Sequence, residues 1–486
     1  MHDALFHVFA TMIIATAFLS LSVCVIETDF QGEERQITSD NYNHILTNVN
    51  VWSHGGKWIY YDVRSDPSGT NFDGKRIERV SVESGAVEII YESRRTACVG
   101  VASASPVADR VVFIHGPEDP TADWSYNAWH RRGVIKDNAT AGSPVNVDAR
   151  DITPPFTAGA LRGGSHVHTF SADGAWIAFT YEDHVLAELD AHDQGHQSDH
   201  ERNARQIGVS VPALSFPGNR VVVDHRNPRN HDGNYFSVVV SNTLDHPRPG
   251  SDEICRACED AWLGNEGYLR VDGTRQRRAI AFQGEVICQD GRHQSEVFVL
   301  DLPDDLMRVG DGPLEGTSTT RPRPPQGVVQ RRLTFTAERK FPGIQGPRHW
   351  LRSSPDGARI ACLMRDDEGI VQLWTVSPST GQLVQLTRNP QDIASAFTWS
   401  PDGKWIAHVM GGSVCATNTS NGETLRLTKT FAEAEAPRPE ACVFSPDGRH
   451  VAYVRQVAAA VTTTNRTAAR QRQTRNQVFI CSMIDR

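Results

Sequence analysis

The sequence predicts an all-β chain that folds as one seven-bladed β-propeller, with a six-bladed ring as the alternative. Three observations support this prediction. A short turn phrase recurs along the chain, two of its intervals match the length of a four-stranded blade, and no stretch shows the apolar period of a long amphipathic helix. A chain of alternating strands and helices would show that helical period repeatedly.

The turn phrase reads Ser-Pro-Asp-Gly and is followed by a β-branched or aromatic run. Proline presets φ, aspartate accepts from nearby backbone N–H groups and glycine supplies a positive φ, so the phrase joins two strands as a hairpin. Gly357, Gly403 and Gly448 lie 46 and 45 residues apart, the length of one blade. Clear copies are 353–364, 399–410 and 444–455, degenerate copies are 52–63, 104–115 and 170–181, and a longer seventh copy is 271–284.

A second marker, Leu-Thr or Ile-Thr, precedes most copies of the phrase. It falls where the outer strand of one blade would end before the chain crosses to the next blade. We expect residues 35–38 to pair with the final strand, 478–484, because a closed ring leaves no exposed sheet edge. Six blades stay open as an alternative because the copy at 271–284 is poor. The marker is found at 36–38, 151–153, 332–334, 385–387 and 426–428.

The propeller domain is predicted over residues 35–486, with long loop insertions near 187–250 and 303–330. These regions include the His/Asp-rich stretch 190–205 and the Pro/Gly/Thr-rich stretch 310–327. A third polar stretch, 462–477, is predicted to be a mobile linker before the last strand.

Residues 1–26 are predicted to be a signal peptide or a membrane anchor, because Ala4 to Ile26 is almost entirely apolar or hydroxylated. The alternative is an over-long start, since no Lys or Arg precedes the apolar stretch. The protein is accordingly expected in the periplasm or otherwise exported, and in the cytoplasm if the start is over-long. With 49 Lys and Arg against 58 Asp and Glu, the net charge of −9 predicts no nucleic-acid partner, and membrane contact only through the N-terminal segment.

The nine cysteines do not suggest a disulfide framework. Cys255 and Cys258 form a C-x-x-C, but no second pair follows at zinc-ribbon spacing, which favours a local disulfide or free thiols over zinc. The sequence contains no nucleophile elbow, phosphate-binding glycine loop or dinucleotide fingerprint.

The inner strands of a propeller line its central channel, so one register before each turn should form a ring of side chains. The position just before the turn is mostly aromatic, whereas the position five residues before the turn serine is polar or small. Both positions fall on the same nominal strand face, so a bulge, twist or depth difference must separate them. The polar ring comprises Asn48, Gly100, His166, His349, Ser395 and Glu440.

This ring holds the candidate metal ligands His166, His168, His349 and Glu440. Two or three imidazoles with one carboxylate suit a divalent transition metal such as manganese, zinc or iron. Two other interpretations remain open, in which these side chains bind buried water and adjacent backbone or form a metal-free ligand pocket. Asn48, Asn50 and Arg162 are candidate ligand-binding residues, and Arg162 could neutralise a substrate carboxylate.

The Leu-Thr marker and the Ser-Pro-Asp-Gly repeat resemble those of TolB-type, WD40-like propellers. Several longer segments are similar to an uncharacterised bacterial family of TolB-like propeller proteins, a domain of unknown function. The resemblance runs from about Arg35 to the C-terminus and implies the fold. It includes LTNVNVW (46–52), FIHGPE (113–118), HRRGV (130–134), LRGGSHVHTFS (161–171), PGSDEI (249–254), GVVQRRLTFT (327–336), PRHW (347–350) and LMRDDEGIVQLW (363–374).

Two functions follow as hypotheses. The first is an exported, non-enzymatic propeller that binds a protein or an envelope ligand such as a carbohydrate, as the resemblance to TolB implies. The second is a metal-dependent lyase or hydrolase of acidic oligosaccharides, which the more distant resemblance to oligogalacturonate lyases implies. In that second case His166 would act as the general base and Arg162 would bind the substrate carboxylate.

Overall fold

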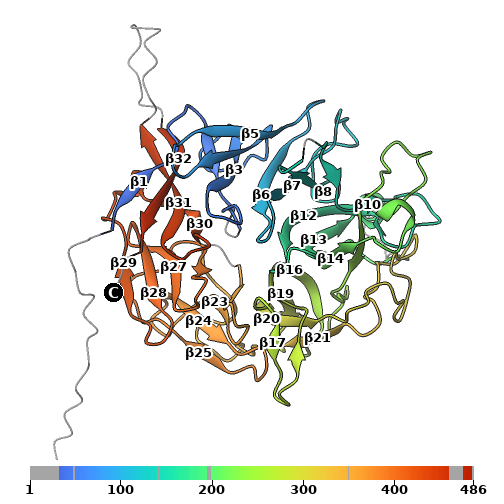
Figure 1. Cartoon of the computed structure of the whole chain (residues 1–486). Coiled ribbons are helices and arrows are strands. Elements are labelled where there is room, and N and C mark those ends of the chain that lie inside the picture. The colour runs from blue at the N-terminus through green and yellow to red at the C-terminus, as the bar shows by residue number, and fades with distance from the viewer. Residues whose placement is uncertain are drawn as a thin grey trace, which may run out of the picture.

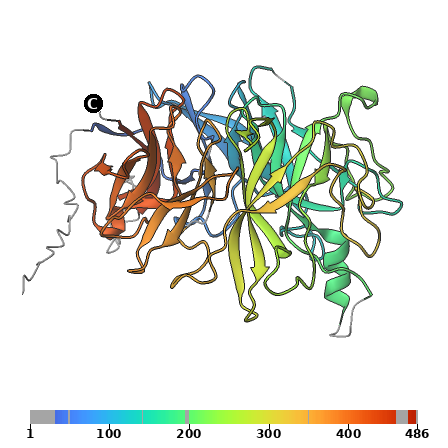
Figure 2. The ribbon, with the colours of Figure 1, turned by 90° about the horizontal axis from the view of Figure 1, so that it is seen from below.

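The computed structural model describes residues 32–47, 50–140, 142–193, 199–347, 350–458 and 474–483. Seven four-stranded antiparallel sheets stand around a central axis as the blades of a propeller (Figure 1). Figure 2 shows the same sheets from the side of the ring. The prediction of seven blades is confirmed, and the six-bladed alternative is wrong. The predicted signal or anchor, residues 1–26, lies outside the described residues.

Each blade runs from an inner to an outer strand in chain order. Blade 1 contains β2 (Asn43–Ile45), β3 (Trp58–Arg64), β4 (Arg76–Ser81) and β5 (Val87–Glu92). Blade 2 contains β6 (Val99–Ala104), β7 (Arg110–His115), β8 (Arg132–Asp137) and β9 (Val145–Asn146). Blade 3 contains β12 (Gly163–Phe170), β13 (Ile177–Asp183), β14 (Gln206–Pro212) and β15 (Tyr235–Val239). Blade 4 contains β16 (Ile254–Trp262), β19 (Ala279–Ile287), β20 (His293–Asp301) and β21 (Val329–Arg332).

Blades 5 to 7 follow the regular repeats. Blade 5 contains β22 (Arg352–Ser353), β23 (Ile360–Arg365), β24 (Val371–Val376) and β25 (Leu383–Gln385). Blade 6 contains β26 (Thr398–Trp399), β27 (Trp405–Met410), β28 (Ser413–Asn418) and β29 (Thr424–Arg426). Blade 7 contains β30 (Pro437–Phe444), β31 (His450–Ala458) and β32 (Thr474–Ser482), and its outer strand is β1 (Glu34–Gln36).

The ring closes as the sequence predicts. β1 pairs antiparallel with β32, with Arg35 opposite Ile480, so the first strand completes the last blade. The backbone N–H of Ile37 then donates to the carbonyl of Val478 at 2.8 Å. The closed ring protects the edge of β32 from pairing with another chain.

The turn phrase has the predicted structure. In blade 7 the Ser445 hydroxyl donates to Asp447 Oδ1 at 2.6 Å, and that oxygen accepts the N–H of Arg449 at 3.0 Å. Gly448 has φ 71°, a conformation that a residue with a β-carbon rarely adopts. The Leu-Thr marker also has a clear role, because Thr334 Oγ1 accepts the N–H of Val297 and Thr387 Oγ1 accepts that of Leu373, both at 2.9 Å. The marker therefore ties the end of the outer strand to the third strand.

Three boundaries differ from the sequence prediction. The stretch 187–250 is not a single loop insertion, because it contains β14 and β15. The polar linker predicted to reach 477 ends earlier, since β32 begins at Thr474, and residues 459–473 lie outside the described residues. The hairpin copy at 271–284 was misplaced, because the inner strand of blade 4 is β16, and a small hairpin of β17 (Tyr268–Leu269) and β18 (Arg275–Gln276) separates it from β19.

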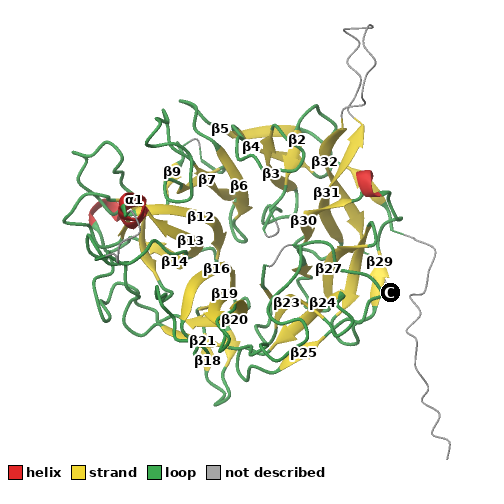
Figure 3. Cartoon of the chain, turned by 180° about the vertical axis from the view of Figure 1, so that it is seen from behind, coloured by secondary structure: helices red, strands yellow, loops and turns green. Residues whose placement is uncertain are grey.

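The remaining elements are short. β10 (Ala149–Arg150) and β11 (Ala160–Leu161) form a two-stranded parallel sheet, and the 3-10 turns are η1 (Pro217–Asn219) and η2 (Glu433–Glu435). Helix α1 (His184–His192), red in Figure 3, follows β13 directly and is capped by Asp183. Within the part of the chain that the structure describes, no helix has the length and apolar character needed to span a membrane.

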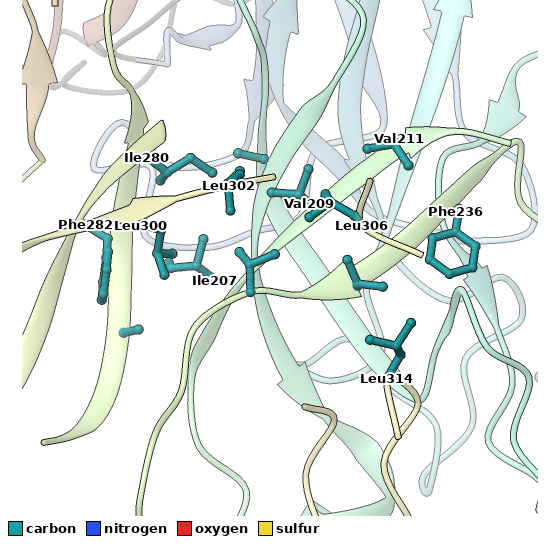
Figure 4. Close-up of a cluster of buried hydrophobic side chains, with 14 of the residues drawn as sticks. Ile207, Val209, Val211, Phe236, Ile280, Phe282, Leu300, Leu302, Leu306 and Leu314 are labelled. Carbon is teal, nitrogen blue, oxygen red and sulfur yellow. The ribbon is translucent and has the colours of Figure 1, made fainter. Parts of the chain in front are cut away.

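The largest apolar cluster lies between blades 3 and 4. Figure 4 shows side chains of β14 and β19, such as Val209 and Phe282, gathered with Leu306 and Leu314 of the segment after β20. The predicted insertion near 303–330 is therefore held to the core by buried leucines, since burial of each contributes about 1.5–3 kcal/mol.

Candidate functional site

A cavity of about 680 Å³ opens at the face of the ring that carries the turn phrases, and we call it the turn-side cavity. Every blade contributes to its wall the end of the inner strand and the turn that follows. Asn50, one of the candidate ligand-binding residues, lines it. Large aromatic rings form much of the wall, namely Trp52, Phe170, Trp262, Trp399 and Phe444.

These aromatic side chains also hold neighbouring blades together. The indole N–H of Trp52 donates to the carbonyl of Val443, that of Trp262 to Thr169 and that of Trp399 to Arg352, each at 3.0 Å. In each case the acceptor belongs to the preceding blade around the ring. The ring faces therefore have fixed positions, as preorganised binding of a ligand requires.

Asp260 and Arg352 are two buried ionisable residues in this wall. Asp260, near the end of β16, is only 5% exposed, and its Oδ2 has no hydrogen-bond partner, although Oδ1 accepts from Thr180 at 3.3 Å. Burial raises the pKa of the Asp260 carboxyl to about 7, with a smaller contribution from Glu259. The Asp260 carboxyl thus changes protonation state near neutral pH.

Arg352 begins β22 and is 8% exposed. Its Nη1 donates to the carbonyl of Leu351 at 2.6 Å, whereas its buried Nε has no partner in the part of the chain that the structure describes. Burial lowers the pKa of Arg352 to about 10, and the charge of Asp260 opposes that shift. A buried guanidinium with an unused N–H beside an ionisable carboxyl can bind a ligand carboxylate or hydroxyl.

The sequence prediction missed Arg352 because the predicted ring used the position five residues before each turn serine, whereas Arg352 lies two residues before Ser354. It missed Asp260 for a different reason. It searched for the inner strand of blade 4 immediately before Val271, whereas the hairpin β17–β18 moves that strand to Ile254–Trp262. Ala261–Trp262 at the end of this strand could have located it in the sequence, because an aromatic residue also precedes the turn in most of the other repeats.

The sequence predicts a bulge, twist or depth difference between the polar position and the aromatic position of each inner strand, and several inner strands contain a bulge. Pairing shifts between Gly100 and Ser103 in β6, between His166 and Thr169 in β12 and between Cys258 and Ala261 in β16. The residue after the first of each pair has positive φ, as in Val167 at 55°. The ring position in blade 4 is therefore Cys258, which the sequence analysis left out.

His166 keeps an unused ring nitrogen. It is 7% exposed, and its buried Nδ1 has no hydrogen-bond partner. Burial, followed by the positive charges of Arg131 and Arg205, lowers its pKa well below the usual value, so the imidazole is neutral. A neutral imidazole can bind a metal or accept a proton.

His168 lies between blades 2 and 3. Its Nε2 contacts the Ser165 hydroxyl at 3.0 Å, that hydroxyl donates to Asp148 at 2.9 Å, and the same carboxylate oxygen accepts the N–H of Gly133. A β-carbon at Gly133 would lie only 2.6 Å from His168 Nε2. His168 thus belongs to a buried inter-blade network, although its Nδ1 has no hydrogen-bond partner.

Arg162 does not face a ligand site. Its Nη2 lies 2.6 Å from Asp183 Oδ2, and the guanidinium also donates to the carbonyls of Thr317 and Thr320. Arg162 is fully buried, so the sequence assignment to a substrate carboxylate is corrected here to a buried structural ion pair.

The other predicted residues do not complete a cluster. Asn48 and His349 lie outside the described residues. Glu440 lies on β30, where its Oε1 accepts from Arg438 Nη2 at 3.1 Å. Among the described residues, His166, His168 and Glu440 do not belong to any group of three ligands that could hold a metal.

Comparison with known proteins places the chain in a family. An alignment over 436 residues with "Uncharacterized protein YidR" of Escherichia coli (strain K12) shows 44% identity and covers 89% of this chain and 97% of that protein. The chain belongs to the YidR family. The family model described as "Protein of unknown function (DUF3748)" matches residues 98–231, and the model of the dipeptidyl peptidase IV N-terminal region matches residues 367–479.

Solved structures resemble this YidR-family propeller in fold. An oligogalacturonate lyase in complex with manganese is 10% identical, with a TM-score of 0.52 and 94% of each chain covered. TolB from Acinetobacter baumannii is 12% identical, with a TM-score of 0.33, covering 88% of this chain and 81% of that one. At these identities the likeness concerns the fold alone.

Two groups of side chains among the described residues of this YidR-family chain could hold a metal ion. One comprises Cys255, Glu285 and His293, with His293 Nδ1 2.6 Å from Glu285 Oε1. Cys255 and Glu285 also line a second cavity of about 850 Å³ at the other end of β16. Both cysteines of the C-x-x-C are free thiols. The other group comprises Asp40, His44 and Glu78.

Proposed function

We propose that this protein is an exported, non-enzymatic propeller that binds a carboxylate-bearing envelope ligand in the turn-side cavity. The observation that carries the proposal is the pair Asp260 and Arg352, each buried and each with an unused polar atom, in a wall of fixed aromatic rings. The apolar stretch before Glu27 supports export.

The polar and aromatic side chains of the turn-side cavity determine which class of ligand it can bind. Arg352 supplies a charge-assisted donor to a carboxylate, and protonated Asp260 supplies a second donor to the same group. Trp52, Trp262 and Trp399 offer apolar surface to a sugar or to a peptide side chain. The envelope ligand is therefore a peptide or a sugar chain that carries a carboxylate.

Intrinsic tryptophan fluorescence can test this proposal, because three of the wall residues are tryptophans. Soluble peptidoglycan fragments, oligogalacturonates and peptides with a free carboxyl terminus are titrated into the wild type and into Arg352→Gln. We expect at least one probe to change the emission and to bind at least about tenfold more weakly to Arg352→Gln, since one charge-assisted hydrogen bond contributes about 1.5–3 kcal/mol.

Arg256→Gln is the matched control, because Arg256 is exposed at the other end of β16 and lines the second cavity. It should leave the affinity unchanged. Binding that depends on Arg256 and not on Arg352 would place the ligand on the opposite face and contradict the proposal.

A pH-dependent stability of the folded state is expected from Asp260. Its carboxyl holds its proton up to about pH 7 when folded but releases it near 3.8 when unfolded, so stability falls as pH rises from about 4 to about 7. The full difference corresponds to about 4 kcal/mol. Asp260→Asn should match the wild type near pH 4 and exceed its unfolding free energy at pH 8, measured by urea denaturation. Glu266→Gln, an exposed change on the same wall, should reproduce the wild-type profile, and equal pH dependence in Asp260→Asn would refute the assignment.

A second function stays open because of His166. Its Nδ1, which has no partner among the described residues, and the nearby Arg131 favour an anionic ligand at the opposite mouth, as a metal-dependent lyase or hydrolase of acidic oligosaccharides requires. The manganese-bound oligogalacturonate lyase of the same fold is the precedent. Incubation of the protein with oligogalacturonates and manganese should then produce the ultraviolet absorbance of an unsaturated product, and His166→Ala should abolish it. No absorbance across a panel of uronate oligomers would exclude the lyase.

A further inference from the structure

A cluster of three metal-binding side chains lies where the N-terminal segment joins blade 1. Asp40 precedes β2, His44 lies on β2 and Glu78 lies on β4. Their ligand atoms all lie within 4.8 Å of one another, and His44 Nε2 is 3.1 Å from Asp40 Oδ1. Asp40 and His44 lie four residues apart in the chain, and the pairing of β2, β3 and β4 in blade 1 brings Glu78 to them.

Burial of these side chains destabilises the folded state when no cation is bound. His44 is 0% exposed and Glu78 is 3% exposed. Among the described residues, the one ion pair of Glu78 is a 3.9 Å contact with Arg76, whose Nε is directed to Glu92 at 2.9 Å. A buried carboxylate with so weak a countercharge is strongly destabilising unless something else compensates it.

Two buried polar atoms at the cluster also lack hydrogen-bond partners among the described residues. They are Nε2 of His44, whose contact with Asp40 does not have hydrogen-bond geometry, and the hydroxyl of Tyr61. The His44 and Tyr61 rings pack with centroids 4.4 Å apart, and Tyr61 lies opposite Glu78 in the sheet. The unpartnered nitrogen and hydroxyl therefore belong to the same small site as the carboxylates.

The other nitrogen of His44 has a hydrogen-bond partner. His44 Nδ1 lies 2.8 Å from Thr38 Oγ1, which also accepts the N–H of Val478 in β32 at 2.9 Å. When Nδ1 donates to Thr38, Nε2 presents its lone pair to Asp40 and Glu78, which is the orientation that a second hydrogen bond imposes on a metal-ligating imidazole.

We propose that Asp40, His44 and Glu78 bind one zinc ion, and that this ion fastens the closing segment of the propeller to blade 1. One imidazole and two carboxylates suit zinc, whereas magnesium and calcium prefer oxygen ligands alone. The site is independent of the turn-side cavity and of the function proposed for it. Through Thr38 it also connects blade 1 to the last blade, so zinc stabilises the closed ring.

The test uses the full chain carrying Cys255→Ser, which removes the other metal-capable group, after dialysis against a chelator. Zinc is added alone, and bound metal is measured by elemental analysis after gel filtration, with affinity by calorimetry and melting temperature by circular dichroism. We expect one zinc per chain and a higher melting temperature with zinc than without it. His44→Gln and Glu78→Gln should weaken zinc binding by at least about tenfold and remove the thermal shift.

Asp40→Asn is included because Asp40 is only half-buried and its replacement should not prevent folding. Glu83→Gln is the matched control, an exposed carboxylate in the turn between β4 and β5, and it should bind zinc like the parent. Failure of the parent to retain zinc would overturn the proposal. Retention of zinc by Asp40→Asn, His44→Gln and Glu78→Gln with parental affinity would overturn it equally.

Discussion

Removal of residues 1–37 is expected to abolish the cooperative melting transition of this protein, whereas removal of residues 1–31 should leave it intact. The longer deletion removes β1, whose backbone hydrogen bonds protect the edge of β32. It also removes Ile37 from the apolar cluster with Val478 and Ile480, and it removes Glu34, which pairs with Arg455 at 3.0 Å. An open ring with an unpaired outer strand invites association between chains.

The measurement is thermal melting by circular dichroism, combined with the yield of monomer from gel filtration. The 1–31 deletion is the control, because it removes only residues that precede the described part of the chain. A 1–37 deletion that melts at the same temperature as this control would show that closure by β1 does not stabilise the ring.

Replacement of Arg162 by alanine is expected to destabilise the protein by about 3–5 kcal/mol, the cost of breaking a buried ion pair from one side. Asp183 would keep a buried negative charge whose remaining side-chain donor is the Tyr181 hydroxyl at 3.0 Å. The carbonyl of Thr317 would lose the Arg162 donor as well, and that of Thr320 would keep the backbone N–H of Thr317 at 3.2 Å. Urea denaturation followed by circular dichroism measures the loss.

Arg256→Ala is the control for this change, because Arg256 is exposed and its replacement should alter the unfolding free energy by less than about 0.5 kcal/mol. If Arg162→Ala lowers the free energy of unfolding by less than about 1 kcal/mol, the buried Arg162–Asp183 pair does not stabilise the fold as its geometry predicts.

Local sequence was sufficient to predict those structural features whose hydrogen bonds all lie within one hairpin. Ser445, Asp447 and Gly448 make their turn through contacts a few residues apart, so the phrase predicts the hairpin directly. Repetition of this turn at blade-length intervals predicted the number of blades, and pairing of the first strand with the last followed from the need to leave no open edge. These features do not depend on how neighbouring blades pack.

The candidate site depended on contacts between blades, which spacing along the chain does not contain. Arg162 has the sequence context of a ligand-binding residue, yet the folded chain brings Asp183 and Thr317 to it. Bulges in the inner strands changed which residues face a common site. The β17–β18 hairpin after Trp262 separates β16, the strand that carries Asp260, from β19, so the spacing of the repeats did not locate β16.

The sequence by itself determined six of the repeated hairpins and the closure of the ring, because turn chemistry and strand alternation are local properties of the chain. Tertiary structure alone decided which polar residues became buried partners and which kept unused atoms, because that outcome depends on what the adjacent blade places within hydrogen-bond distance. His168 faces Ser165 and the backbone of blade 2 at Gly133, whereas Asp260 and Arg352 keep unpaired atoms in the wall of the turn-side cavity.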